Sequence, residues 1–231
     1  MVIKKGYRNE LVQKLQYRLG LTPDGVFGYK TESCVKDWQK YNNLTVDGIV
    51  GNTTWRSIFN TDIYKLSPIG VVIHSMSEYL EVDNEVLTAE KFLKKIGLSV
   101  HALVHPSGDV TLITPTDERA FHAGVSKVGN IENLNKHTLG VELLVPGLNT
   151  YGEFLNTIET EVWWTEIQIS KCVDLVLSWI QKYNISASDV FRHSDVSGEQ
   201  VRGPRYAKKD PGKSFPWQNF LLTISQKSRI V

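Results

Sequence analysis

The sequence predicts a two-domain protein in which a small all-α domain of three helices precedes an α/β domain with a mixed central sheet flanked by helices. Three observations predict this fold. Apolar residues recur at helical spacing over the first 60 residues, short β-branched runs begin only after residue 68, and helical segments then intervene between those runs. We therefore expect domains at residues 1–60 and 68–231, joined by a linker at 61–67.

The first domain is marked by an internal repeat. LTPDGVFGYKT at residues 21–31 aligns with LTVDGIVGNTT at residues 44–54, with six of eleven positions identical. In each copy the Asp-Gly pair is a turn signal, and the threonine that follows can open a helix. The repeat therefore predicts three short helices joined by two similar loops.

The second domain combines strands with helices. Strands are expected at residues 71–74, 100–104, 109–113 and 139–145, where β-branched residues are bounded by turn signals. Helices are expected at residues 88–95 and 165–183, the second with one continuous apolar face. This order is typical of a mixed sheet with helices packed on it.

Composition narrows the possible partners. The 231 residues are 41% hydrophobic, and 26 basic residues nearly balance 25 acidic ones, which gives a net charge of +1. No single-sign field results, so we expect no nucleic-acid partner. No run of about 18 apolar residues occurs, so we expect no membrane insertion. The two cysteines, Cys34 and Cys172, lie among apolar neighbours far apart in sequence, which favours buried free thiols over a disulfide.

All six histidines fall in the second domain. His101 and His105 are four residues apart in a strand-like segment, which places their rings about 13 Å apart, too far to share one zinc ion. His137 lies in a polar loop and is expected to be solvated. These three histidines therefore do not form a metal site with one another.

Two other histidines come at strand ends. His74 ends the apolar run VVIH, and His193 follows the short run VFR. A buried histidine that simply finds a hydrogen-bond partner is one interpretation of His74. With one carboxylate nearby, however, the pair would form a catalytic zinc site with a position open for water. The candidate carboxylate is Asp210 in YAKKDPG, where Pro211 favours an extended backbone.

The order of these motifs carries a family resemblance. VIHSM, AFHAGVS, LGVELL, RHSD and K-x-D-P-G follow one another over about 150 residues. This order resembles the zinc-dependent N-acetylmuramoyl-L-alanine amidases of the type-2 family, which are related to the peptidoglycan recognition proteins. The resemblance implies hydrolysis of the amide between N-acetylmuramic acid and L-alanine of peptidoglycan, with Zn²⁺ as cofactor. It implies three zinc ligands, His74, His193 and Asp210. It also implies two catalytic residues, Glu142 and Lys208, and one residue on the substrate side, His122.

The K-x-D spacing favours Lys208 over Lys209 as the catalytic lysine. Residues two apart in an extended segment share a face, so Lys208 can point into the site that Asp210 would coordinate while Lys209 points to solvent. The loop before them is longer than in the family pattern, and its Arg202, Gly203 and Pro204 match no family role.

The repeat of the first domain resembles the small three-helix peptidoglycan-binding domain found beside many cell-wall hydrolases. The resemblance implies that residues 1–60 tether the protein to bacterial peptidoglycan and carry no chemistry. From the sequence, the aromatic residues near the loops can be either core residues or glycan contacts, namely Phe27, Trp38 and Trp55.

Together the two resemblances predict a phage endolysin. Four alternatives stay open: a non-catalytic peptidoglycan recognition protein, a zinc peptidase acting on stem peptides, a wall-anchoring phage protein with a vestigial site, and a bacterial autolysin exported by another route. The peptidase motif S-x-H-x-x-G-x-A-x-D does not occur in the sequence. Because the first 16 residues hold no apolar run typical of a secretion signal, we expect the protein to wait in the host cytoplasm until lysis.

Overall fold

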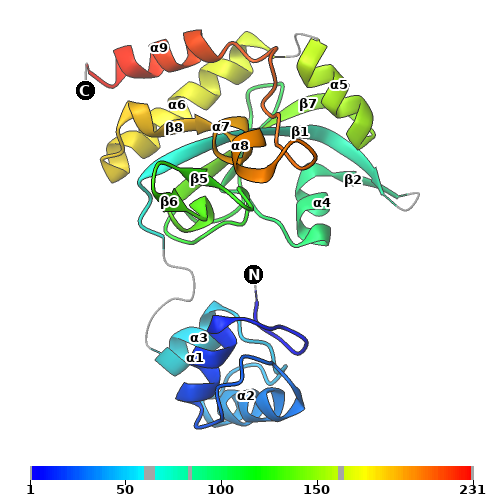
Figure 1. Cartoon of the computed structure of the whole chain (residues 1–231), viewed down its shortest axis with the longest axis vertical. Coiled ribbons are helices and arrows are strands. Elements are labelled where there is room, and N and C mark those ends of the chain that lie inside the picture. The colour runs from blue at the N-terminus through cyan, green and yellow to red at the C-terminus, as the bar shows by residue number, and fades with distance from the viewer. Residues whose placement is uncertain (1, 60–65, 83–84, 161–163, 230–231) are drawn as a thin grey trace. The chain divides into compact units, whose positions relative to one another are not determined.

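The computed structural model describes residues 2–59, 66–82, 85–160 and 164–229. The chain divides into two compact units, Met1–Lys65 and Leu66–Val231 (Figure 1). Most of the expected linker at 61–67 lies outside the described residues. Each unit has its own hydrophobic core.

The first unit contains the three predicted helices, α1 (Glu10–Arg18), α2 (Tyr29–Tyr41) and α3 (Asn52–Phe59). Phe27 and Trp55 are 1% and 5% exposed and belong to the core of this unit, and Trp38 packs partly buried against it. Of the three aromatic residues considered as glycan contacts, Phe27 and Trp55 are therefore core residues.

A buried glutamine holds each repeated loop. Nε2 of Gln16 donates to Asp24 Oδ1 at 2.7 Å, and its Oε1 accepts from the Gly25 N–H at 2.9 Å. Gln39, 23 residues later, bonds the aspartate and glycine of the second loop in the same way, at 2.8 and 2.9 Å. Both glycines have positive φ, 75° in the first loop and 73° in the second, so the turn suits glycine. The repeat in sequence is thus a repeat in hydrogen bonding.

The second unit is built on the mixed sheet that the sequence predicts. Its strand order is β2-β1-β7-β3-β4, with β8 also paired to β1. The pairs β1·β7, β3·β7 and β1·β8 are parallel, whereas β1·β2 and β3·β4 are antiparallel. The strands are β1 (Gly70–Val82), β2 (Glu85–Thr88), β3 (Ala102–Val104), β4 (Val110–Leu112), β7 (Thr138–Asn149) and β8 (Val190–Arg192), and a small separate sheet pairs β5 (Lys127–Val128) with β6 (Ile131–Glu132).

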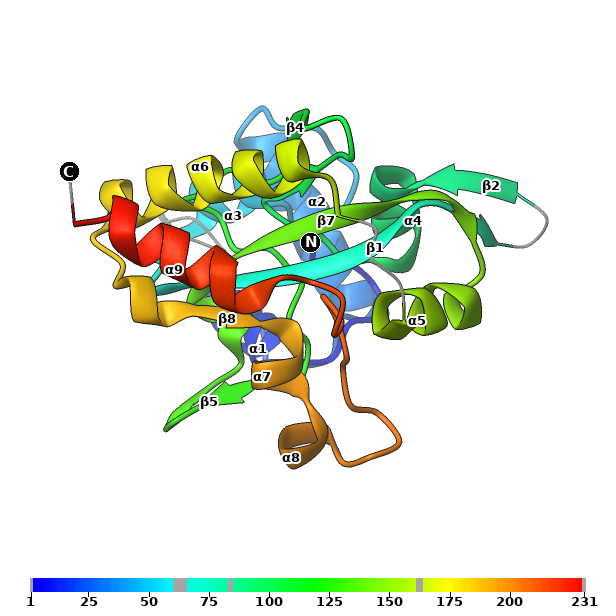
Figure 2. The same ribbon diagram turned by 90° about the horizontal axis from the view of Figure 1, so that it is seen from above.

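Helices cover both faces of the sheet. Helix α6 (Glu166–Tyr183) lies beside α9 (Trp217–Lys227) and packs with it on one face, whereas α4 (Ala89–Ile96) packs on the other (Figure 2). Helix α5 (Tyr151–Thr160) follows β7, and the short helices α7 (His193–Ser197) and α8 (Glu199–Arg202) follow β8. Among the described residues no helix combines the length and apolarity needed to cross a membrane. Cys34 and Cys172 are free thiols, the first half-buried and the second buried.

Strand alternation decides which side chains face the site. Ile73 of β1 and Val141 of β7 point into the core beneath α6 and α9. The next residues along each strand, His74 and Glu142, therefore point to the opposite face. They are directly paired in the parallel β1·β7 ladder, so the imidazole and the carboxyl group lie on neighbouring strands.

Candidate active site

The two central histidines are brought together by strand pairing. In the parallel β1·β8 ladder Ile73 pairs with Arg192, so the residues that follow, His74 and His193, lie next to each other. Their ring centroids are 4.2 Å apart, and both side chains are buried. His193 is also the first residue of α7, so the chain turns away from the sheet at this histidine.

Asp210 joins them from the loop before α9. Its Oδ2 lies 2.9 Å from His193 Nδ1 and 3.5 Å from His74 Nδ1. Its backbone carbonyl accepts from the Ser194 N–H at 3.0 Å, which ties this loop to the start of α7. One ligand atom from each of His74, His193 and Asp210 lies within 4.8 Å of the others, and all three residues are buried.

A hydrogen-bonded row of side chains sets the tautomer of His74. His122 Nε2 lies 3.2 Å from the Thr138 carbonyl oxygen, which can only accept, so Nε2 of a neutral His122 carries the proton. Nδ1 of His122 is then an acceptor, and it lies 2.8 Å from His74 Nε2. His74 must donate from Nε2, which leaves the lone pair of its Nδ1 facing Asp210 and His193.

The same loop contacts the second histidine. His193 Nε2 lies 3.4 Å from the Ala123 carbonyl oxygen, to which the Ser197 hydroxyl also donates at 2.8 Å. This acceptor favours a proton on Nε2 and leaves Nδ1 of His193 directed at the Asp210 carboxylate. A proton or a metal cation can be shared there.

The electrostatics of the three groups agree with cation binding. Burial and the neighbouring His193 lower the pKa of His74 to about 4, so its imidazole is neutral and able to coordinate at neutral pH. Burial alone would raise the pKa of the Asp210 carboxyl group, but the charges and hydrogen bonds of His193 and His74 hold it well below its usual range. Two imidazole nitrogens and one carboxylate oxygen are a donor set that suits zinc. The residues present therefore fit the metal that the sequence predicts.

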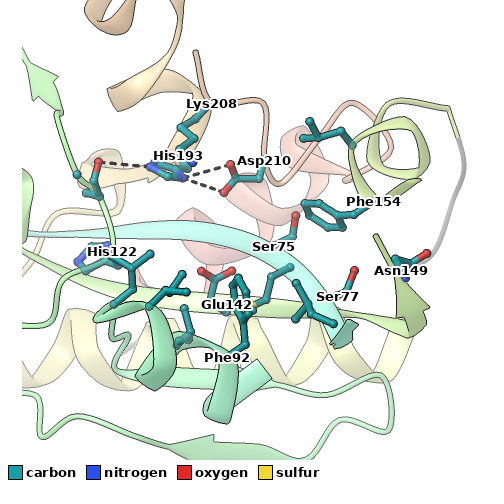
Figure 3. Close-up of a pocket in the computed structure, with 18 of the residues that line it drawn as sticks. Ser75, Ser77, Phe92, His122, Glu142, Asn149, Phe154, His193, Lys208 and Asp210 are labelled. Atoms are coloured by element: carbon teal, nitrogen blue, oxygen red, sulfur yellow. Dashed lines mark hydrogen bonds and ion pairs between the residues drawn. The ribbon is translucent and has the colours of Figure 1, made fainter. Parts of the chain in front are cut away.

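Glu142 is a buried carboxyl group beside this cluster. Burial and the negative charge of Asp210 raise its pKa well above the ordinary value. Its Oε2 makes no hydrogen bond within the described part of the chain. Figure 3 shows the carboxyl group directed from β7 towards His193 and Asp210 across the cavity. A buried carboxyl group whose pKa is raised in this way can take part in proton transfer.

The two lysines of YAKKDPG are separated as the spacing predicts. Lys208 lines the same cavity as Glu142 and Asp210, and its positive charge lowers the pKa of Glu142. The Lys208 N–H donates to the Ser197 carbonyl at 3.0 Å, which fixes the extended segment against α7. Lys209 is exposed and does not line the cavity.

The cavity has a volume of about 470 Å³ and extends from the histidines along β1 (Figure 3). One wall is apolar and is formed by Phe92 and Leu93 of α4. The hydroxyls of Ser75 and Ser77 are buried in the lining and have no hydrogen-bond partner among the described residues. Buried hydroxyls without a partner are uncommon, and these two lie in the wall of the candidate site.

The other histidines are not members of the cluster of His74, His193 and Asp210. His101 Nδ1 accepts from the Gly140 N–H at 2.9 Å, and its Nε2 bonds the Glu118 carbonyl, so both nitrogens are used. His105 contacts Thr111, and His137 is a half-buried loop residue. His122 lies at the cavity wall, behind His74.

Comparison with known proteins shows the family. A family model for N-acetylmuramoyl-L-alanine amidase matches residues 64–213, which hold every residue of the site. The chain belongs to this amidase family. A second family model, for a peptidoglycan binding domain, matches residues 8–58 and so covers the three-helix unit.

Two relatives illustrate the match. The 1,6-anhydro-N-acetylmuramyl-L-alanine amidase AmpD of Enterobacter cloacae is 31% identical over 137 residues, which are 58% of this chain and 63% of that protein. The N-acetylmuramoyl-L-alanine amidase AmiD of Escherichia coli (strain K12) is 29% identical over 106 residues, 46% of this chain and 34% of that protein. The chain thus spans less than two thirds of the length of either relative.

Solved structures share the fold. A crystal structure of a Se-Met AmpD derivative superposes with a TM-score of 0.51 at 24% identity and covers 70% of this chain and 89% of that one. AmpDh3 from Pseudomonas aeruginosa, in complex with anhydromuramic pentapeptide, has a TM-score of 0.51 at 23% identity and covers 71% of this chain and 62% of that one. Both structures agree with the sheet and helices of the amidase unit.

Sequence reasoning missed the groups that support the site. The carbonyls of Ala123 and Thr138 are backbone atoms, which no residue type marks in advance. Gly140 offered a signal, because it directly precedes the Val-Glu pair of the motif LGVELL. A Cβ at Gly140 would lie 2.6 Å from Cγ of His122, so the absence of a side chain there makes room for that ring.

Proposed function

We propose that the chain is a zinc-dependent amidase that hydrolyses the bond between N-acetylmuramic acid and L-alanine in bacterial peptidoglycan. The observation that carries this proposal is the convergence of His74, His193 and Asp210 beside Glu142 and Lys208 in one cavity. The names of the relatives, both muramyl-L-alanine amidases, support the choice of bond.

The two histidines and Asp210 would hold Zn²⁺. When bound there, the ion would lower the pKa of a water molecule towards about 7 and polarise the scissile carbonyl. Glu142 accepts a proton from the attacking water and passes it to the leaving amine, a task for which its raised pKa suits it. Lys208 stabilises the negative charge that develops on the carbonyl oxygen, a contribution of about 3–4 kcal/mol for a well-placed donor.

Intact cell wall is the favoured substrate over small soluble fragments. The match of residues 8–58 to a peptidoglycan binding domain supports this choice, because a tether concentrates the enzyme on an insoluble polymer. The non-catalytic recognition protein is disfavoured, because each residue that the resemblance requires for zinc and for proton transfer is present. The stem-peptide peptidase has no motif of its own in the chain.

The test is digestion of purified peptidoglycan with zinc, with a chelator, and with zinc restored after chelation, followed by mass analysis of the products. We expect free peptides and peptide-free glycan strands in the first and third digests only. Cleavage within peptides or between sugars would overturn the assignment of the bond. Full activity in the chelator would overturn zinc dependence.

The proposed biological role is that of a phage endolysin held in the host cytoplasm until the membrane opens. A wall-binding unit followed by an amidase suits an enzyme that degrades the wall at lysis. Cells expressing the chain should stay intact until the membrane is permeabilised and then lose turbidity within minutes. Lysis without permeabilisation would show that the protein reaches the wall by itself.

A further inference from the structure

The segment between His193 and Asp210 contains an arginine that the proposed mechanism does not use. Arg202 ends α8, and the chain then turns at Gly203, whose φ of 72° suits glycine. Arg202 lines the cavity that holds Glu142 and Lys208, whereas Arg205, three residues later, is exposed and does not line it. The longer loop therefore places one additional cation at the candidate active site.

The guanidinium group of Arg202 is not engaged within the protein. It forms no hydrogen bond or ion pair with any residue in the described ranges, although Arg192 nearby binds Asp195 through three contacts of 2.7–3.1 Å. A guanidinium group offers five N–H donors in a planar fork. Those of Arg202 are free to bind a ligand.

The Arg202 side chain lies beside Gly124, in the loop that faces α7. The Ser197 hydroxyl donates to the carbonyls of Ala123 and Val125, both at 2.8 Å, and so ties α7 to the facing loop. Between these two residues lies Gly124, where an added Cβ would come 3.4 Å from Arg202 Nη1. The arginine thus packs over a residue without a side chain, and Gly124 also lines the cavity.

The chemistry of the substrate identifies the partner. Carboxylates of the protein also line the cavity, but none of these described carboxylates pairs with Arg202. Asp210 contacts His74 and His193 instead. In the proposed substrate the sugar side of the scissile amide is neutral, and ionised groups lie on the stem peptide. Arginine binds a carboxylate through two parallel hydrogen bonds between opposite charges. A carboxamide has no negative charge and cannot form the same ion pair.

We propose that Arg202 binds a carboxylate of the stem peptide and makes the enzyme selective for stems in which the acidic residue next to L-alanine is not amidated. This inference rests on the proposed function, since it assigns part of the substrate to one wall of the same cavity. Arg202 acts on binding and specificity, and the proton transfers remain with Glu142.

The test uses two synthetic muramoyl-tetrapeptides that differ only in a free carboxylate or a carboxamide on the residue after L-alanine. For the wild-type protein we expect kcat/KM to be about 10- to 100-fold higher on the free acid, mainly through a lower KM, as for one charged hydrogen-bonded pair. Arg202→Ala should reduce this ratio to below about twofold, and Arg202→Lys should keep part of it. Arg205→Ala is the matched control and should retain the full ratio.

An unchanged ratio in Arg202→Ala, or equal turnover of both substrates by the wild type, would overturn the role of Arg202 and leave the proposed amidase activity standing. Cleavage of neither substrate at the muramoyl–alanine bond would overturn both. If thermal unfolding shows that Arg202→Ala does not fold, the test uses Arg202→Lys instead. If Arg202→Lys keeps the full wild-type difference in KM between the two substrates, that result would count against a bidentate contact.

Discussion

At the scale of single residues, the two adjacent lysines of YAKKDPG form a natural pair for comparison. Lys208 lines the cavity and Lys209 is exposed, so only the first can reach a developing oxyanion. We expect Lys208→Ala to lower kcat about 100- to 1000-fold, the loss typical of one oxyanion donor. Lys209→Ala should change kcat by less than about twofold. Equal losses of kcat in both variants would show that Lys208 is not the lysine that stabilises the oxyanion.

A second prediction concerns His122, whose Nδ1 accepts from His74 Nε2 at 2.8 Å. Removing that acceptor frees His74 to take the tautomer that cannot coordinate. We therefore expect His122→Ala to weaken zinc affinity about 10- to 100-fold, as measured by competition with a chromophoric chelator. His137→Ala, in an outer loop, is the control. If His122 instead acts by touching substrate, as the resemblance implies, KM will rise while zinc affinity stays within threefold.

The site residues differ in how far sequence could locate them. His74 and His193 stand at the ends of apolar strands, and Asp210 precedes a proline, so residue type and order suggested that they meet. The acceptors that orient them, such as the Ala123 carbonyl, depend on how a loop folds over the sheet and leave no trace in residue type. Arg202 lies in a loop that departs from the family pattern, but only the structure shows that this residue lines the cavity.

At the scale of elements, apolar periodicity predicted β1, β3, β4, β7, α4 and α6 of the second unit, but it did not predict the core helix α9 or the full length of β1. The expected strand at 71–74 is the start of β1, which continues to Val82. Ser75, Ser77 and Glu78 interrupt the apolar run, so composition hides the rest of the strand. Helix α5 was not anticipated, because its Thr157 and Asn156 are weak helix formers and tertiary packing of Phe154 and Ile158 stabilises it.

The glutamine clasps of the first unit were also missed, although they share the 23-residue offset of the repeat. Each buried glutamine donates to the aspartate and accepts from the buried glycine N–H of one loop, so its removal leaves that N–H without its partner. We expect Gln16→Ala or Gln39→Ala to lower the free energy of unfolding of this unit by about 2 kcal/mol. A domain of about 60 residues is only marginally stable, so the effect is large.

Hydrogen exchange read by mass spectrometry can follow this change in the full chain. Amides of α1, α2 and α3 should exchange faster in the Gln16 variant, while those of β1 and β7 keep their wild-type rates. Lys14→Ala, at an exposed position of the same helix, is the control. Unchanged protection of the three helices would mean that the clasp contributes little to stability.

At the scale of the whole molecule, the main hydrophobic core of each unit shares no described residue with that of the other. The core of the first unit is formed by residues between Ile3 and Ile58, and that of the amidase unit by residues between Leu66 and Ile224. Every residue of the candidate site belongs to the second unit. Catalysis and attachment to the wall should therefore be separable functions.

Removal of residues 1–65 tests this separation. The remaining chain keeps its complete sheet and cavity, so kcat/KM on a soluble muramoyl-peptide should stay within about twofold of the full-length value. On intact cell wall we expect the rate at low enzyme concentration to fall at least tenfold, because the tether no longer raises the local concentration of enzyme. A cosedimentation assay with purified wall should show a matching loss of binding. Equal losses on both substrates would mean that the first unit supports the catalytic fold, and undiminished activity on wall would mean that it provides no tether.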